Sequence, residues 1–253
     1  MKKTPGKGTM IVTGGSRGIG AATARLAAVH GYSVAVNYIR GTEEAEKVAA
    51  EIRRDGGSAT AIQADVADEK AVIQLFTEAE RKLGSVSVLV NNAGTTGGFA
   101  RADEVSQGLL NRLFATNVIG TMLCAREAVL RLSARHGGDG GSIINISSQA
   151  AIIGGAGEWA HYAATKGAIN TFTIGLAREV AREGIRVNAV SPGLIDTGLH
   201  AAAGAPDRAM RLAPGIPMGR PGAAEEVAQV VLWLASPSAS YITGAIVPAS
   251  GGR

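Results

Sequence analysis

The chain has 253 residues, which is long enough for one large α/β domain with a substantial buried core. Hydrophobic residues make up 46% of it and aromatic residues only 4%, so Ala, Val, Ile and Leu are expected to form the core. Such a core is typical of a parallel sheet covered by helices. The formal net charge is +4, but basic residues are spread among acidic ones, which argues against a nucleic-acid partner.

Cysteine, histidine and N-terminal patterns exclude several kinds of site. Cys124 is the only cysteine, so no internal disulfide can form, as is usual in a reducing cytosol. The four histidines lack the spacing of metal ligands, and no metal site is expected. The N-terminus lacks the long apolar core of a signal peptide, and no stretch is expected to span a membrane. We therefore expect a cytoplasmic protein without metal, nucleic-acid or membrane partners.

Short apolar segments alternate with amphipathic helical ones, without a linker, a repeat or a change in composition. We therefore predict a single domain over residues 1–253. The predicted strands are Thr9–Val12, Ser33–Asn37, Ala59–Gln63, Val86–Asn91, Ser142–Ser147, Ile185–Val190 and a last one near Ala245–Pro248. Strands that alternate with helices imply a parallel sheet with right-handed crossovers. The predicted fold class is α/β, a doubly wound parallel sheet with helices on both faces.

Two of the predicted helices have recognisable starts. One begins at Thr42, a good N-cap residue that is followed by two glutamates in the first turn. Another begins after Asp68, and its Val72, Ile73 and Phe76 are predicted to lie on one buried face.

Two further helical segments, Leu113–Leu130 and Tyr162–Val180, are apolar nearly all round. A helix without a polar face is expected to be covered on both sides. One side would meet the sheet, and the other would meet either loops of the same chain or another subunit. We favour the second interpretation and expect an oligomer.

The most informative segment is the glycine-rich run Thr13–Gly20, which lies between the strand Thr9–Val12 and a predicted helix Ile19–Val29. Glycines at such a turn let a diphosphate approach the backbone and the unpaired N–H groups of the first helical turn. A glycine cluster alone is a weak signal, and this one departs from the G-x-G-x-x-G spacing.

Other candidate residues also fall where a predicted strand ends. In open α/β sheets, ligands bind beyond the carboxyl ends of the strands, so these residues are expected to share one rim. Besides the glycine-rich run, the segments at strand ends are Asn37–Arg40, Asp65–Val66, Asn91–Gly94, Ser148 and Ser191–Gly193.

Tyr162 and Lys166 supply candidate reaction chemistry. They are four residues apart, so on a helix they share a face. A free phenol has a pKa near 10, and lowering it to about 7 requires roughly 4 kcal/mol. An ammonium group about 4 Å away supplies roughly that at an effective dielectric constant near 20. The spacing therefore predicts an acid/base pair in which Lys166 lowers the pKa of Tyr162.

Two polar residues accompany this pair. Ser148 ends a predicted strand, and its hydroxyl is expected to polarise a substrate carbonyl, whereas strand alternation points the neighbouring Ser147 to the other face. Asn117 lies in an otherwise apolar helix. From the sequence it is either a hydrogen-bonded buried amide or a residue that holds a water relay behind Lys166.

Together these motifs resemble the classical short-chain dehydrogenases/reductases over essentially the full chain. The matching motifs are Thr13-Gly14-x-x-x-Gly18-x-Gly20, Asn91-x-Ala93-Gly94, Asn117, Ser148, Tyr162-x-x-x-Lys166 and Pro192-Gly193. The resemblance implies a Rossmann-type sheet of seven strands, hydride transfer with a nicotinamide dinucleotide and a homotetramer or, as the alternative, a dimer.

The resemblance also implies roles for individual residues. Ser148 would position the substrate, Tyr162 would donate or accept the proton, Lys166 would tune Tyr162 and bind the nicotinamide ribose, and Asn117 would hold the relay. The residues expected to bind the dinucleotide are Gly14, Ser16, Arg17, Gly18, Ile19, Gly20, Asn37, Tyr38, Arg40, Asp65, Val66, Asn91, Ala93, Gly94, Tyr162, Lys166, Pro192, Gly193, Ile195 and Thr197.

The sequence favours NADP(H) over NAD(H). NAD selectivity normally uses an acid at the end of the second strand, whereas an arginine accommodates a 2′-phosphate. There is no acid between Ser33 and Thr42, while Arg40 and Arg17 are at hand. A guanidinium group suits a phosphate, so we expect NADP(H).

The function expected from these residues is an oxidoreductase that interconverts a carbonyl and a secondary alcohol by hydride transfer. The carbonyl substrate is a ketone, a 3-oxoacyl compound or a sugar-like compound. Alternatives are a non-catalytic dinucleotide sensor on the same fold, and an epimerase or dehydratase with the same nucleotide module. Gly193–Pro221, with Met210 and Met218, is predicted to be a mobile lid over an apolar-leaning pocket. Trp159 would either stack on a ring-shaped substrate or pack inside the protein.

Overall fold

The computed structural model describes residues 7–198 and 203–253. His200 and part of the predicted lid lie outside these residues. Seven parallel strands form one sheet in the order β3-β2-β1-β4-β5-β6-β7, which confirms the predicted fold class. The strands are β1 (Thr9–Val12), β2 (Ser33–Tyr38), β3 (Ser58–Gln63), β4 (Val86–Asn91), β5 (Gly141–Ile146), β6 (Ile185–Pro192) and β7 (Ile246–Ala249). The bounds of β1 and β4 are those predicted, and the bounds of the other strands differ from the predicted ones by one or two residues.

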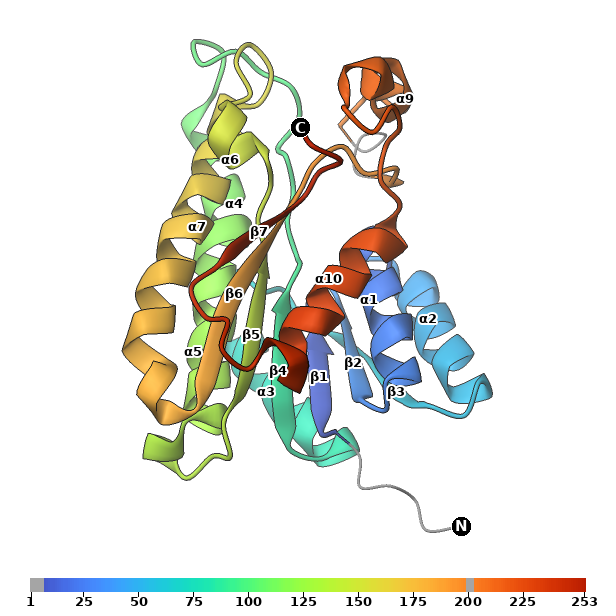
Figure 1. Ribbon diagram of the computed structural model, residues 1–253, viewed down its shortest axis with the longest axis vertical. Helices are drawn as coiled ribbons and strands as arrows, with labels where there is room; N and C mark the ends of the chain where they lie inside the picture. Colours follow the sequence, from blue (N-terminus) through green and yellow to red (C-terminus); the bar gives the residue numbers. More distant parts are fainter. Residues whose placement is uncertain (1–6, 199–202) are drawn as a thin grey trace.

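Helices cover both faces of this sheet (Figure 1). Within the described residues, the α-helices are α1 (Gly18–Val29), α2 (Thr42–Arg54), α3 (Glu69–Leu83), α4 (Gln107–Phe114), α5 (Gly120–Leu132), α6 (Ala150–Ile153), α7 (Ala160–Val180), α9 (Arg208–Leu212) and α10 (Ala224–Ala235). A π-helical turn, Ala115–Ile119, joins α4 to α5. Helices α1, α2 and α10 pack on one face of the sheet, and α3, α5 and α7 pack on the other.

The alternation of side chains along β1 shows how the two layers of core are built. Met10 and Val12 point into the layer with α1, α2 and α10, and Ile11 points into the layer with α3, α5 and α7. Val12 lies beside Val36 of β2 and Val90 of β4, so the three strands end close together. This register brings the loops that follow them to one edge of the sheet.

Two details of the predicted helices are wrong. Gly41, in the left-handed conformation with φ +80°, is the N-cap of α2, and Thr42 is its first helical residue without a side-chain cap. Ile73 is 41% exposed, whereas Val72 and Phe76 are fully buried, because residues four apart share a helix face and Ile73 is turned away from it. Asp68 caps α3 as predicted, since its carboxylate accepts the backbone N–H of Ala71.

One stretch within the described residues, Gln107–Leu132, is long and apolar enough to cross a membrane by length and composition. Half of its most apolar window is buried inside the structure, where α5 packs on the sheet. A buried core helix meets the same criteria, so the finding carries no membrane argument.

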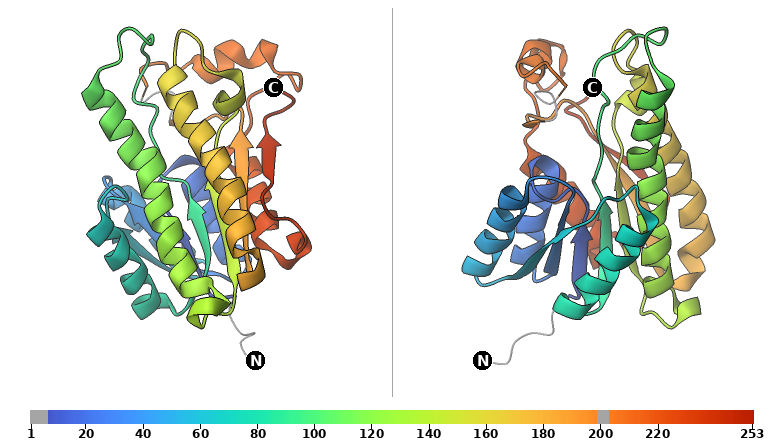
Figure 2. Two further views of the ribbon diagram at one scale, coloured as in Figure 1. Left: turned by 90° about the vertical axis from the view of Figure 1, so that its left-hand side faces the viewer. Right: turned by 180° about the vertical axis from the view of Figure 1, so that it is seen from behind.

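The outer surface of the α4–α5 segment is apolar. Phe114, Ile119, Met122 and Leu130 are large hydrophobic side chains with exposed surface there. The left view of Figure 2 shows α5 and α7 side by side on this outer surface.

Candidate active site

A cavity of about 1090 Å³ lies at the carboxyl ends of the strands. It runs from the glycine-rich turn after β1 to Tyr162 and Lys166 on α7, as the sequence predicts. The predicted dinucleotide-binding residues that line it are Gly14, Ser16, Arg17, Gly18, Ile19, Asn37, Tyr38, Arg40, Asp65, Val66, Ala93, Gly94, Tyr162, Lys166, Pro192, Gly193, Ile195 and Thr197. Gly20 and Asn91 do not line it.

Gly20 lies behind the glycine-rich turn instead. A Cβ atom there would lie 2.3 Å from the carbonyl oxygen of Gly14, so only glycine lets α1 pack this closely on the turn. Gly14 and Gly18 have φ angles of +60° and +53°, which glycine adopts without strain. Glycines therefore fix the shape of the turn as well as leaving room for a ligand.

Asn91 is a structural residue of the sheet. Its buried amide donates to Asn145 Oδ1 of β5 at 3.0 Å and to the carbonyl oxygen of Thr121 at 3.3 Å. The neighbouring Asn92, which the sequence analysis did not single out, braces the glycine-rich turn. Its Nδ2 donates to the carbonyl oxygens of Thr13 and Gly14, both at 2.9 Å.

Asn37 braces the same turn from β2. Its Oδ1 accepts the backbone N–H of Gly14 at 3.2 Å, and its Nδ2 donates to the carbonyl oxygens of Ile62 and Ala64. The side chain thus ties the glycine-rich turn to the end of β3. Both the oxygen and the nitrogen of its side-chain amide are therefore hydrogen-bonded to backbone groups.

Tyr162, Lys166 and Ser148 come together at the other end of the cavity. Lys166 Nζ lies 5.7 Å from the centre of the Tyr162 ring and donates to the carbonyl oxygen of Ile146 at 2.7 Å. Ser148 lies within hydrogen-bonding reach of the Tyr162 hydroxyl. Ser147 instead donates to Asn170 Oδ1 at 2.6 Å. Ser148 rather than Ser147 therefore contacts the Tyr162 hydroxyl.

The predicted effect of Lys166 on Tyr162 is wrong for the chain by itself. Burial raises the pKa of Tyr162 to about 12, and the hydrogen bond with Ser148 offsets this only in part. Burial also lowers the pKa of Lys166 to about 8. Burial thus favours the neutral form of both groups, a cost that the simple Coulomb argument leaves out.

Asn117 lies in the π-helical turn, and its side chain is fully hydrogen-bonded. Its Oδ1 accepts the N–H of Thr95 at 2.9 Å, and its Nδ2 donates to the carbonyl oxygen of Thr95 and to Thr165 Oγ1. It makes no direct bond to Lys166 within the described chain. A Cβ atom at Gly94 would contact both Asn117 Oδ1 and Lys166 Nζ, at 3.4 and 3.7 Å, so the two groups lie close.

The far end of the cavity carries an aromatic and charged cluster. Trp159 stacks on Phe99 with ring centres 4.8 Å apart and meets the Tyr162 ring edge-on at 5.9 Å. Trp159 is 7% exposed, which agrees with a packing role. Arg208 of α9 lies over the Trp159 ring and is paired with Glu158.

The lid segment differs from the prediction in how its side chains point. Met210 and Met218 are 65% and 64% exposed, and neither lines the main cavity. Arg208, which the sequence does not single out, is a buried charged side chain of this segment. The local sequence does not indicate that Arg208 is buried, because its partner Glu158 lies about fifty positions earlier in the chain.

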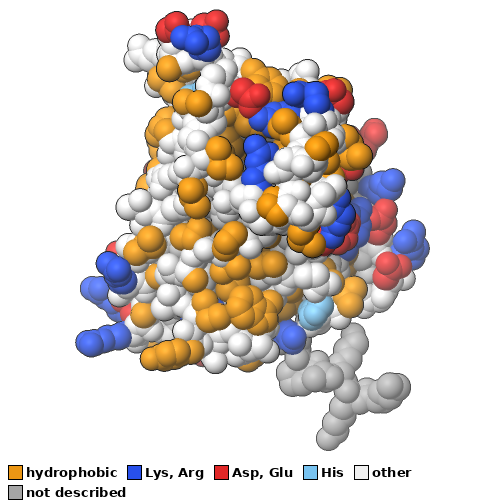
Figure 3. All heavy atoms as spheres, turned by 45° about the horizontal axis from the view of Figure 1, so that its top comes forward, with side chains coloured by type: hydrophobic (Ala, Val, Ile, Leu, Met, Phe, Trp, Pro, Cys, Tyr) orange, Lys and Arg blue, Asp and Glu red, His pale blue; other side chains and the backbone are white. Residues whose placement is uncertain are grey.

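Arg17 and Arg40 lie at the opposite end of the cavity, beside Tyr38 and Asp65. Both arginines are exposed, and neither forms an ion pair within residues 7–198 and 203–253. Figure 3 turns the top of the molecule toward the viewer. On this face, basic and acidic side chains lie scattered among apolar ones, without a continuous basic stripe.

The residues present fit a dinucleotide. The turn after β1 admits no further side chain at Gly14 or Gly20, the α1 N-terminus carries no acidic residue in its first turn, and basic side chains lie beside it. Such a turn offers backbone N–H groups to a phosphate. The cavity then continues to the phenol and amine of α7.

Comparison with known proteins agrees with this geometry. Residues 14–253 match the family described as enoyl-(acyl carrier protein) reductase. An uncharacterized oxidoreductase of Escherichia coli, YgfF, is 48% identical over 96% of this chain and 98% of its own length. The cis-4-hydroxycyclohexanecarboxylate dehydrogenase of Sinomonas cyclohexanicum is 38% identical over 96% of this chain and 94% of its own. A solved short-chain dehydrogenase/reductase of Serratia marcescens has a TM-score of 0.86 at 38% identity, with 98% of each chain covered.

The sheet, the cavity and these relatives together define a Rossmann-fold oxidoreductase. The chain belongs to the short-chain dehydrogenase/reductase family. It is an NAD(P)-dependent enzyme that acts on CH–OH groups.

Proposed function

We propose that the protein is an NADP(H)-dependent oxidoreductase that interconverts a ketone and a secondary alcohol, within one unit that spans residues 1–253. The observation that carries the proposal is that Tyr162, Lys166 and Ser148 line the same cavity as the glycine-rich turn. A bound nicotinamide supplies or accepts the hydride. The chain's own residues then have to position the carbonyl and move one proton.

Each of these residues has a part in the proposal. Ser148 donates a hydrogen bond to the substrate oxygen and fixes its position. Tyr162 carries its proton at neutral pH, since burial holds its pKa at about 12, and so acts as the donor in carbonyl reduction. Lys166 holds the nicotinamide ribose, and Asn117 keeps the relay behind Lys166 in place.

The test of this proposal is Tyr162→Phe. Loss of a general acid lowers the rate by roughly 100- to 10,000-fold, so NADPH oxidation with a panel of ketones should nearly disappear. The dissociation constant of NADPH, measured by fluorescence titration, should change little. A sensor without catalytic function would instead show no turnover in the unmutated protein. An epimerase or dehydratase would convert its substrate without net use of NADPH.

The preference for NADP(H) is supported by Arg17 and Arg40, which line the cavity with Tyr38 and form no ion pair with any described residue. A 2′-phosphate offers both guanidinium groups a partner. Arg17→Ala and Arg40→Ala should each raise the KM for NADPH and leave that for NADH nearly unchanged. Equal kcat/KM for both cofactors in the unmutated enzyme would contradict this preference.

Two further parts of the proposal concern assembly and location. The exposed side chains of Phe114, Ile119, Met122 and Leu130 support association through the α4–α5 surface, and we propose a homotetramer. We also propose a cytoplasmic location. The substrate is a small carbonyl compound or its alcohol. The enoyl-(acyl carrier protein) family description and the hydroxycyclohexanecarboxylate relative point to different substrates, so family membership does not select one.

A further inference from the structure

Arg208 is a buried cation in the substrate end of the cavity. Its side chain is only 7% exposed, and it lines the cavity from α9. The guanidinium carbon lies 4.4 Å from the centre of the Trp159 ring and 5.7 Å from that of Phe99. Its Nη2 donates to the carboxylate of Glu158. Aromatic faces and one carboxylate therefore hold the charge in place.

The hydrogen-bonding capacity of Arg208 is not filled. A guanidinium group has five N–H donors in a planar fork. Nε is buried and has no hydrogen-bond partner among the described residues. Glu158 engages Nη2 alone, and its own side chain is 42% exposed. A buried donor without a partner is costly, and this points to a ligand that supplies the missing acceptor.

Arg208 lies near the candidate proton donor, Tyr162. Trp159 meets the Tyr162 ring edge-on at 5.9 Å, so a single indole ring separates the guanidinium from the candidate proton donor. Arg112 also lines the cavity. Among the described lining residues, basic side chains outnumber Asp65 and Glu158, so the cavity as a whole carries a net positive charge.

We propose that Arg208 binds a carboxylate of the substrate, and that the enzyme acts on a compact ring ketone or ring alcohol whose carboxylate lies away from the reacting carbon. This inference rests on the proposed function. The carboxylate accepts the unfilled N–H groups of Arg208, and the ring packs beside Trp159 and Phe99. Arg208 is thus a specificity-determining residue, because an uncharged analogue leaves the buried donors unpaired.

Binding to the enzyme saturated with NADP⁺ tests the inference without turnover. Cyclohexanecarboxylate and cyclohexanecarboxamide have the same shape but differ in charge, and calorimetry measures their dissociation constants. The carboxylate should bind at least about tenfold more tightly. Hydrogen bonds to charged groups contribute about 1.5–3 kcal/mol, so Arg208→Gln should weaken the carboxylate about 10- to 100-fold and leave the amide nearly unchanged.

The matched control is Arg211→Gln, on the same helix but exposed. It should affect neither ligand. Arg208→Lys keeps the charge without the planar fork and should fall between the unmutated enzyme and Arg208→Gln. Circular dichroism shows whether Arg208→Gln folds. If it does not fold, Arg208→Lys still tests the inference.

Turnover separates this inference from the proposed function. With NADPH, kcat/KM for 4-oxocyclohexanecarboxylate should exceed that for its methyl ester, and Arg208→Gln should remove the difference. Equal affinity for the carboxylate and the amide, or no binding of either, would overturn the inference. The inference would also be overturned if Arg208→Gln weakened the binding of the carboxylate and of the amide equally, because Arg208 would then only hold the lid segment in place. If the enzyme reduces neutral ketones and carboxylate-bearing ketones equally well, the inference is refuted but the proposed function is not. If it reduces no ketone with NADPH, the proposed function is refuted.

Discussion

Asn92 offers a sharp test of how the glycine-rich turn is held. Its Nδ2 donates to the carbonyl oxygens of Thr13 and Gly14, both at 2.9 Å. Asn92→Asp keeps the shape of the side chain but replaces this donor with a carboxylate oxygen. The substituted group then faces two acceptors and has no proton to give either of them at neutral pH.

The expected cost follows from these two contacts. Each neutral hydrogen bond contributes about 0.5–1.5 kcal/mol, and a carboxylate that faces carbonyl oxygens adds a desolvation cost. We expect Asn92→Asp to lower the free energy of unfolding by about 2–4 kcal/mol at pH 7. Because the same contacts set the position of Gly14, the dissociation constant of NADPH should also rise, by about tenfold for each 1.4 kcal/mol lost from the turn.

The destabilisation caused by Asn92→Asp is expected to increase with pH. Facing two carbonyl oxygens raises the pKa of the introduced carboxyl above its unfolded value of about 3.9, since the protonated form can donate to one of them. The folded state therefore holds its proton to higher pH than the unfolded state. The destabilisation should be small below about pH 4 and grow as the pH rises through the folded-state pKa.

Urea unfolding at pH 3.5 and pH 7, with NADPH titration by fluorescence, measures both effects. The control is Asn111→Asp, in an exposed position of α4, where a change within about 0.5 kcal/mol is expected. If Asn92→Asp were as stable at pH 7 as this control, the proposed bracing of the turn would be refuted.

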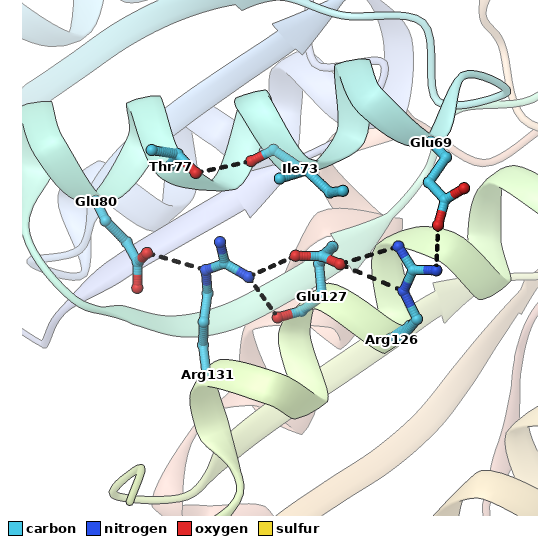
Figure 4. A network of polar contacts seen from close by, with 7 residues as sticks. All are labelled: Glu69, Ile73, Thr77, Glu80, Arg126, Glu127 and Arg131. Atoms are coloured by element: carbon cyan, nitrogen blue, oxygen red, sulfur yellow. Dashed lines mark hydrogen bonds and ion pairs between the residues drawn. The ribbon is translucent and has the colours of Figure 1, made fainter. Parts of the chain in front are cut away.

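Two other predictions concern charges elsewhere in the fold. Glu127 of α5 is buried and accepts from Arg131 at 2.7 Å and from Arg126 at 3.1 Å (Figure 4). Glu127→Ala should lower the free energy of unfolding by about 2–3 kcal/mol, whereas Glu78→Ala, which breaks an exposed pair, should leave the urea midpoint unchanged. Since burial lowers the pKa of Lys166 to about 8, its ammonium form disappears above that pH, and kcat/KM for NADPH should fall there. A profile flat to pH 10 would contradict this.

The fold and much of the site could be predicted because their signals are local. Apolar runs separated by helical patterns give the seven strands, and several candidate segments lie where a strand ends. Parallel strands end at one edge, so this local order places Gly14, Asp65 and Ser148 on one cavity. The same reasoning chooses Ser148 over Ser147.

Other residues could not be found this way, because their partners lie far along the chain. Asn92 looks like a motif neighbour of Asn91, yet it contacts a turn 78 residues earlier. Arg208 lies in a segment whose composition suggests an apolar lid, and its contacts are with Glu158 and Trp159. The sequence does not show which arginine of this segment is buried, since Arg211 lies on the same helix as Arg208 and is exposed.

The disagreement over Tyr162 has a different origin, because the residues and their spacing were correct. Four residues of separation do place Lys166 over the Tyr162 ring, at 5.7 Å. The Coulomb argument treats both groups as already charged and omits the cost of taking them out of water. Burial acts on each toward its neutral form, so the phenol keeps its proton and the amine holds its charge only up to about pH 8. The chain by itself therefore presents a proton donor at neutral pH, which suits carbonyl reduction, whereas alcohol oxidation requires additional positive charge close to the phenol.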